Sequence, residues 1–142
     1  MNLRRSNPRR SNPRKGATVI EFALTFLLLI TLVAGVFELG RAVWTYNALT
    51  HAAKQASRYA MVHGARNPLG QSDTSVENYA KAQVVGVPAA DVTVNVVTDP
   101  NNEPGSKVTV TVATTLNFVV APLLGLDRSV TLRGKSVKTI VN

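Results

Sequence analysis

RKGATVIEFALTFLLLI, residues 14–30, decides the fold of this chain, because it joins a basic segment to a long apolar one through a single glycine. One acidic residue, Glu21, lies inside the apolar part. A carboxylate at the head of an apolar segment of this length is costly to place in lipid, so Glu21 calls for a functional explanation.

The apolar run is long enough to cross a membrane. Residues 22–37 carry no charge, and residues 17–20 extend the run on the other side of Glu21. Counted from Ala17, about 21 residues rise roughly 31 Å as a helix, which matches a hydrocarbon core of about 30 Å. The sequence therefore predicts a transmembrane helix over residues 17–40, with membrane lipid as its surroundings.

Positive charge is concentrated at the start of the chain. The net charge of the 142 residues is +8, yet six basic residues lie within residues 1–15, which hold no acidic residue: Arg4, Arg5, Arg9, Arg10, Arg14 and Lys15. The positive-inside rule then places the N-terminus in the cytoplasm and everything after Arg41 outside. The remainder is nearly neutral, with ten basic and eight acidic residues, which argues against nucleic acid as a partner. Two RRSNP repeats, at residues 4–8 and 9–13, lead us to expect a disordered leader.

The helical pattern continues beyond the membrane edge. Apolar residues recur at spacings of three and four, and no proline or paired glycine interrupts them before Gly64: Leu39, Val43, Tyr46, Leu49, Ala53, Ala56 and Ala60. We expect one helix over residues 18–63, whose second half leaves the bilayer. Its alanines suit packing against a second helix or against the protein's own sheet, and the pattern does not decide between them.

The rest of the chain predicts a short helix and three strands. Thr74 and Glu77 have capping-box spacing and open a helix that ends near residue 86. Alternating valines predict strands over residues 92–98 and 107–117, and residues 129–141 form a third strand that Gly134 weakens. The expected fold class is α+β: a long N-terminal helix packed, at its outer half, on a small antiparallel sheet. Residues 41–142 would form the single extracytoplasmic domain.

Two further features allow more than one interpretation. Glu38 and Arg41, three residues apart, suit a solvated ion pair on the helix surface better than a recognition site. The apolar residues 116–126 are too short to span a membrane and contain Pro122, so they either pack under the sheet, which we favour, or rest on the bilayer surface.

Composition and motifs argue against catalysis. The chain has no cysteine, which excludes disulfides and thiolate chemistry. His51 and His63 have no companions at metal-ligand spacing, and neither a nucleophile elbow nor a phosphate-binding glycine loop is present. We therefore expect no enzyme activity, no metal and no cofactor.

The residues at the start of the apolar helix resemble a known signal. Lys15-Gly16 followed by ATVIEF, residues 17–22, and then a long apolar helix is similar to the class III signal of type IV pilins and pseudopilins. The segments FELGR at residues 37–41 and ALTHAAKQASRYA at residues 48–60 resemble the TadE-like pseudopilins of tight-adherence pilus systems. Leu27 departs from the pattern, since many such proteins have a proline nearby.

This resemblance implies a function and a set of site residues. The basic leader, residues 1–16, would be cut after Gly16 by a prepilin peptidase, with Ala17 as the new N-terminus and Glu21 as the fifth residue of the mature chain. The fold would be pilin-like. The chain would be a structural or assembly component in the bacterial inner membrane and could enter a pilus. Its partners would be other pilins or pseudopilins and the pilus assembly platform.

A physical argument, independent of the resemblance, also supports a role for Glu21 in subunit packing. Cleavage after Gly16 creates an ammonium at Ala17, and a carboxylate one helical turn away can pair with that ammonium or with a neighbouring subunit's. Because either charge alone in lipid is costly, mutual neutralisation can drive and align subunit packing, with Phe22 beside it. A simpler alternative is that Glu21 only gains from the helix dipole, by about 0.3–1 kcal/mol. Gly16 likewise has a simpler alternative, that it only interrupts the chain before the helix.

Two other functions compete with a pilus role. The apolar run and the small residues Val33-Ala34-Gly35 allow an ordinary signal peptide that releases a periplasmic or secreted binding module, although the run exceeds the usual length of about 7–15 residues. The basic repeats alternatively allow an anchored arm that binds nucleic acid or anionic lipid.

Overall fold

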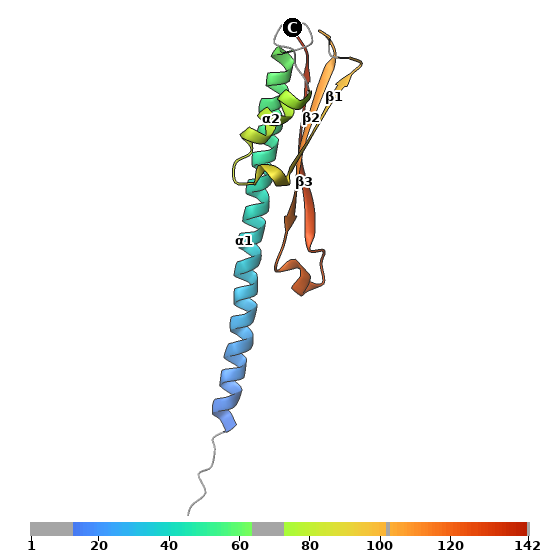
Figure 1. Ribbon diagram of the computed structural model, residues 1–142. Helices are drawn as coiled ribbons and strands as arrows, with labels where there is room; N and C mark the ends of the chain where they lie inside the picture. The colour runs from blue at the N-terminus through green and yellow to red at the C-terminus, as the bar shows by residue number, and fades with distance from the viewer. Residues whose placement is uncertain (1–12, 64–72, 102, 142) are drawn as a thin grey trace, which may run out of the picture.

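The computed structural model describes residues 13–63, 73–101 and 103–141, and it consists of one long helix with a three-stranded sheet beside its outer half (Figure 1). The helices are α1 (Pro13–Val62) and α2 (Asp73–Gln83), and the strands are β1 (Val92–Asp99), β2 (Lys107–Asn117) and β3 (Ser129–Thr139). Two short 3-10 turns are η1 (Ala89–Asp91) and η2 (Ala121–Leu124). The expected α+β class, a long apolar helix packed on a small antiparallel sheet, is confirmed.

Helix α1 runs for 50 residues without interruption and passes Leu27 as a regular helix. It begins at Pro13, so the expected disorder is wrong for residues 13–15, while residues 1–12 lie outside the described part of the chain. Proline suits the first turn of a helix because its fixed φ is helical and the missing N–H would have no partner there. The uncut chain therefore continues the helix across Gly16.

The sheet is an antiparallel meander in the order β1-β2-β3. On β2, Val108, Val110 and Val112 point into the core with at most 1% of their surface exposed, and the residues between them are more exposed. This alternation is the period of a strand with one buried face. Helix α2 starts at Asp73, so Thr74 lies within the first turn and is not the capping residue that we expected.

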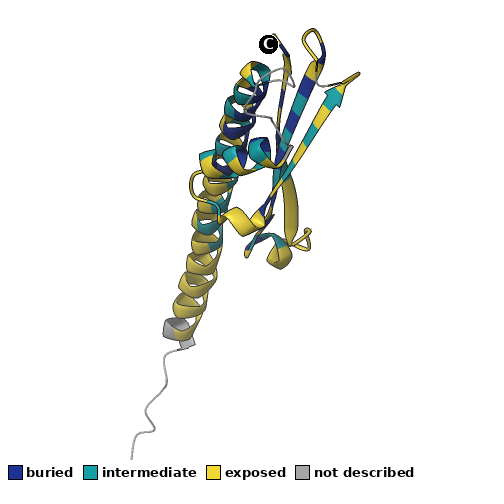
Figure 2. Cartoon of the chain, turned by 45° about the horizontal axis from the view of Figure 1, so that its top comes forward, coloured by how far each residue is buried: buried dark blue, intermediate teal, exposed yellow. Residues whose placement is uncertain are grey.

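The core lies between the outer half of α1, α2 and the sheet (Figure 2). Four alanines of α1 are fully or almost fully buried there: Ala52, Ala53, Ala56 and Ala60. They pack with Leu49, Val76, Ala80 and Ile140 in the same core. Small side chains let the sheet approach the helix backbone closely. The open choice for these alanines is therefore decided in favour of the protein's own sheet and α2.

Gly134 is the point of closest approach between β3 and α1. A Cβ atom added there would lie 2.5 Å from Leu49 C and Thr50 N, and 2.6 Å from Leu49 O. Two residues along the strand, the buried Ser136 hydroxyl lies 2.8 Å from the Ser57 hydroxyl of α1. The glycine that weakens the strand pattern is thus the residue that allows the helix to cross the strand.

Candidate functional site

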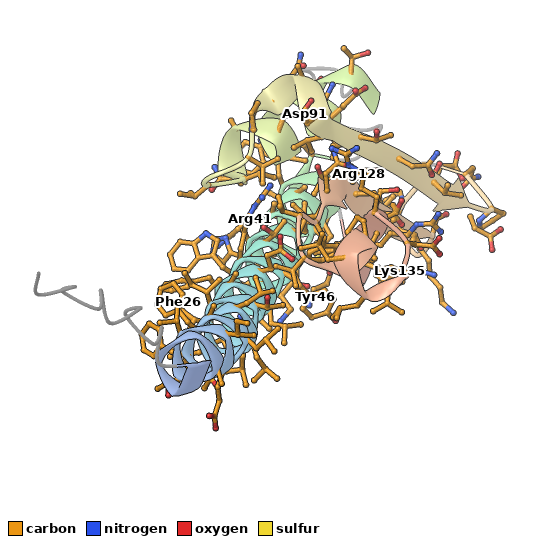
Figure 3. All side chains as sticks on the ribbon, turned by 90° about the horizontal axis from the view of Figure 1, so that it is seen from below. Phe26, Arg41, Tyr46, Asp91, Arg128 and Lys135 are labelled. Atoms are coloured by element: carbon orange, nitrogen blue, oxygen red, sulfur yellow. The ribbon has the colours of Figure 1, made fainter. Side chains whose placement is uncertain are left out.

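The first half of α1 is an apolar surface that is exposed over most of its length, with the turn between β2 and β3 beside only its last turns. Seen along its axis from the N-terminal end, the helix carries side chains on all sides, and Phe26 lies on the side away from the sheet (Figure 3). Among the described residues this is the one helix long and apolar enough to cross a membrane, and none of its most apolar window is buried. A helix that is apolar all round requires lipid or other helices around it.

Gly16 and Ala17 lie inside α1 and are exposed. A Cβ atom on Gly16 would meet nothing within 4 Å in the described structure. Glycine within a helix costs about 1 kcal/mol relative to alanine, so intramolecular packing gives no reason for this residue. The arrangement leaves the Gly16–Ala17 peptide accessible within a helical turn.

The Glu21 carboxylate projects from α1 and forms no hydrogen bond or ion pair with any residue whose side chain the structure describes. Its backbone oxygen accepts a hydrogen bond from the Thr25 hydroxyl, at 2.9 Å. The helix dipole acts most strongly within the first turn of a helix. Because α1 begins at Pro13, Glu21 lies beyond that turn. The dipole alternative is therefore weak in the uncut chain.

Phe22 follows Glu21 and presents a second exposed feature. Its ring stacks on Phe26 one turn further on, with centroids 6.0 Å apart and an interplanar angle of 16°. Phe22 remains 69% exposed, so this aromatic ridge is available to lipid or to a neighbouring helix. Arg14 and Lys15 lie in the first turn of α1, but their side chains are outside the described part.

The outer end of the apolar surface is marked by Arg41 and by the exposed aromatic residues Trp44 and Tyr46. Such residues gather at the interface between lipid and water. The expected ion pair between Glu38 and Arg41 is wrong, since the one ion pair among the described residues joins Lys81 to Glu77.

Glu38 instead binds the turn between β2 and β3. The backbone N–H groups of Val119 and Val120 donate to its carboxylate, with Val120 N 3.1 Å from Oε1 and 3.2 Å from Oε2. Hydrogen bonds to a charged acceptor are stronger than those between neutral groups, and two such donors explain why this contact replaces the pair with Arg41.

Residues 118–126, here called the hairpin tip, connect β2 to β3 beside α1. We expected residues 116–126 to pack in the core. This holds for Leu116 and Val120, but the other large aliphatic side chains of the hairpin tip are 63–77% exposed: Val119, Leu123, Leu124 and Leu126. The turn is η2 with Gly125 at φ 73°, which aims these side chains outward instead of under the sheet.

Comparison with known proteins identifies the helix. The family model described as TadE-like protein matches residues 16–58. This segment is similar to TadE-like proteins. The resemblance drawn from the sequence is thereby confirmed over the segment that holds Gly16, Ala17, Glu21 and Phe22. No curated protein and no solved structure matches the chain.

The TadE-like match has consequences for function and location. It implies a pilin-like structural component associated with a tight-adherence pilus. Together with the long apolar N-terminal helix, it fits a membrane-anchored protein.

The TadE-like segment ends at residue 58, so the hairpin tip lies outside it. Sequence reasoning missed the contact between Glu38 and the hairpin tip, because the partners are 81 and 82 residues apart and no periodic pattern links them. A signal was present in the uncharged run FVVAPLLGL, which contains a proline and a glycine and is too apolar for an ordinary surface turn.

The two histidines lie in separate local contacts. His51 Nε2 is 3.4 Å from Gln55 Nε2, and His63 Nδ1 is 2.9 Å from the backbone oxygen of Tyr59. In residues 13–63, 73–101 and 103–141, no three His, Cys, Asp or Glu side chains gather as metal ligands would.

Proposed function

We propose that this chain is a pseudopilin of a tight-adherence pilus system, processed by a prepilin peptidase after Gly16. The observation that carries the proposal is an uncovered apolar helix, TadE-like in sequence, whose head exposes Gly16, Ala17, Glu21 and Phe22 together. The partners are the peptidase, other pilins or pseudopilins, the inner-membrane assembly platform and membrane lipid.

Cleavage requires the first turn of α1 to open. A peptidase binds its substrate as an extended strand, whereas the Gly16–Ala17 peptide is helical in the uncut chain. Only one helical turn, residues 13–16, precedes the bond, and a glycine within it lowers the cost of unwinding. Gly16 has no packing role to lose, which supports its role at the cleavage site.

After the cut, Glu21 gains a partner that the uncut chain lacks. The new ammonium at Ala17 lies one helical turn before the carboxylate, in the same apolar surroundings. Each charge alone in lipid costs several kcal/mol, so pairing between subunits stabilises and aligns their helices. Phe22, exposed beside Glu21, supplies apolar contact area at the same level.

The same helix offers close approach to a neighbour. A Cβ atom on the exposed Gly40 would also meet nothing within 4 Å. Small residues on a membrane helix let a second helix pack against its backbone. This surface supports assembly with other pilin helices in the inner membrane.

Arg14 and Lys15 orient the helix in this proposal. They stand at the cytoplasmic end of the span, and the positive-inside rule then puts residues 41–142 in the periplasm or on the pilus. The basic leader acts before processing and is lost with it.

The intact mass of the protein purified from its host membrane tests the proposal. We expect a mature chain that begins at Ala17, and a leader that is retained when Gly16 is replaced in Gly16→Leu. Gly40→Leu is the matched control, because it introduces the same side chain at another open helical glycine, and it should be processed normally. A chain that begins after Gly35 would instead indicate an ordinary signal peptide and would overturn the proposal.

A further inference from the structure

The hairpin tip is the largest apolar feature of the chain that the pilin-like role leaves unexplained. Residues 118–126 carry no charge, and the first charged residue after them is Asp127. The aliphatic side chains at its apex are mostly exposed: Val119 by 77%, Leu123 by 74%, Leu124 by 64% and Leu126 by 63%. No described element of the protein covers them.

Hydrogen bonds to Glu38 hold the hairpin tip against α1, and a groove lies between the two. The Glu38 carboxylate accepts the N–H groups of Val119 and Val120, and Val120 is only 7% exposed. Val120 and Leu124 also line a groove of about 610 Å³ together with the face of α1 from Leu24 to Leu39. The hairpin tip therefore lies beside the apolar helix and is hydrogen-bonded to it at Glu38.

The position along α1 places the hairpin tip at membrane depth. A span of about 20 residues that starts at Ala17 ends near Phe37, so Glu38 lies at the outer edge of the hydrocarbon. The turn between β2 and β3 points toward the N-terminal end of α1 (Figure 1), and Leu124 lines a groove with Thr31, Leu32 and Gly35, which precede Glu38 on the helix. The apex of the hairpin tip thus lies on the lipid side of Glu38.

Charged and aromatic residues lie beyond the hairpin tip, at the level expected for lipid headgroups. Arg41, Trp44 and Tyr46 are exposed on the next turns of α1, and the exposed Asp127 and Arg128 follow the hairpin tip in the chain. The apolar surface of the apex is continuous with that of the span, because both line the same groove.

We propose that the hairpin tip inserts into the outer leaflet and that acyl chains cover Leu123, Leu124 and Leu126. The inference rests on the membrane span of α1, but not on cleavage after Gly16. It gives the chain a second membrane contact, which sets the orientation of the sheet above the bilayer. It also means that a subunit leaving the membrane has to withdraw the hairpin tip as well as the helix.

Spin labels test the insertion cleanly, since the chain has no cysteine of its own. Single-cysteine variants Leu123→Cys, Leu28→Cys and Val97→Cys are labelled in the full chain and placed in phosphatidylethanolamine–phosphatidylglycerol vesicles at low protein density. Leu28 reports the span, and Val97, which is 52% exposed on β1, is an exposed apolar control outside it. Relaxation by oxygen, which concentrates in lipid, is compared with relaxation by a water-soluble nickel chelate.

The label at position 123 should behave like that at position 28, with oxygen favoured several-fold over the nickel chelate relative to position 97. If it behaves like position 97 while position 28 still reports lipid, the insertion is wrong although the span is right. Dipolar broadening between labels at position 123 at low protein density would also overturn it, because copies of the chain would then cover the hairpin tip.

A charge at the apex provides a second test that does not depend on the label at position 123. With the label at Val119→Cys, Leu123→Asp should shift the accessibility from oxygen toward the nickel chelate several-fold, because a carboxylate is costly in lipid. The same charge at Val97→Asp should leave that label unchanged. An unchanged label in Leu123→Asp would contradict insertion.

Discussion

At single residues, glycine has two different uses in this chain. Gly134 is needed by the fold, because the backbone of α1 passes where its Cβ would stand. Gly16, Gly35 and Gly40 face open space, so the described chain does not require them. In the proposed function, Gly16 serves cleavage and Gly40 serves helix association.

The two uses predict opposite results for the same substitution. Gly134→Ala forces β3 away from Leu49 and Thr50 and should lower the free energy of unfolding by about 1–3 kcal/mol, as overpacking does. Gly40→Ala adds the same methyl group in open space and should raise stability by up to about 1 kcal/mol. Urea unfolding in detergent micelles measures both, and equal effects would contradict the close approach at Gly134.

Glu21 is a second residue to which the proposed function gives a partner outside the monomer. We expect Glu21→Ala to insert in the membrane and be cleaved normally but to give few or no pili, because the ammonium of Ala17 then has no carboxylate to pair with. Glu21→Gln, which keeps the size of the side chain and removes its charge, should show the same loss. Intact mass checks processing and the yield of sheared pili checks assembly. Assembly at the level of the parent in either variant would refute the inter-subunit role.

At the scale of elements, two contacts distant in sequence join α1 to the β2–β3 hairpin. The Ser57 hydroxyl donates to Lys54 O at 3.0 Å and accepts from Ser136, which fastens β3 to the outer half of the helix. Glu38, which lies nearer the apolar half of α1 than Ser57 does, binds the backbone of the hairpin tip. The hairpin is thus held at both ends of its contact with α1.

Loss of the Glu38 carboxylate should loosen the hairpin tip without unfolding the sheet. In Glu38→Ala the opening free energy at Val119 and Val120 should fall by about 1 kcal/mol, so their amides should exchange hydrogen roughly fivefold faster. Glu77→Ala is the matched control, since it removes a carboxylate paired only with Lys81. Hydrogen exchange followed by mass spectrometry measures both, and unchanged protection in Glu38→Ala would contradict the contact.

At the scale of the whole molecule, the buried core and the apolar span occupy different halves of α1. Every residue of the hydrophobic core cluster lies at Leu49 or later, and the first half of the helix contributes none. We expect a chain that starts at Arg41 to keep its sheet and to unfold cooperatively, as measured by circular dichroism during urea unfolding. Loss of β-structure in this chain would show that the domain depends on the span.

Local pattern was sufficient for much of this structure. Apolar length predicted a helix apolar enough to cross a membrane, three- and four-residue spacing predicted that this helix is continuous, and valine alternation at Val108, Val110 and Val112 predicted a strand with one buried face. The TadE-like resemblance of the segment with Gly16 and Glu21 was also readable, because the residues that carry it are close together in the chain. Such features depend on neighbours within one turn or one strand.

The sequence alone therefore determined the helices and strands of this protein, and it placed Gly16, Glu21 and Phe22 close together at the head of the long helix. Only the tertiary structure decided that the alanines of α1 face the protein's own sheet, that Gly134 marks a helix crossing, and that Glu38 holds the hairpin tip beside the span. The physical reason is distance along the chain. These contacts join residues about 80 apart, and their energies depend on how the helix and the sheet meet, which no local periodicity records.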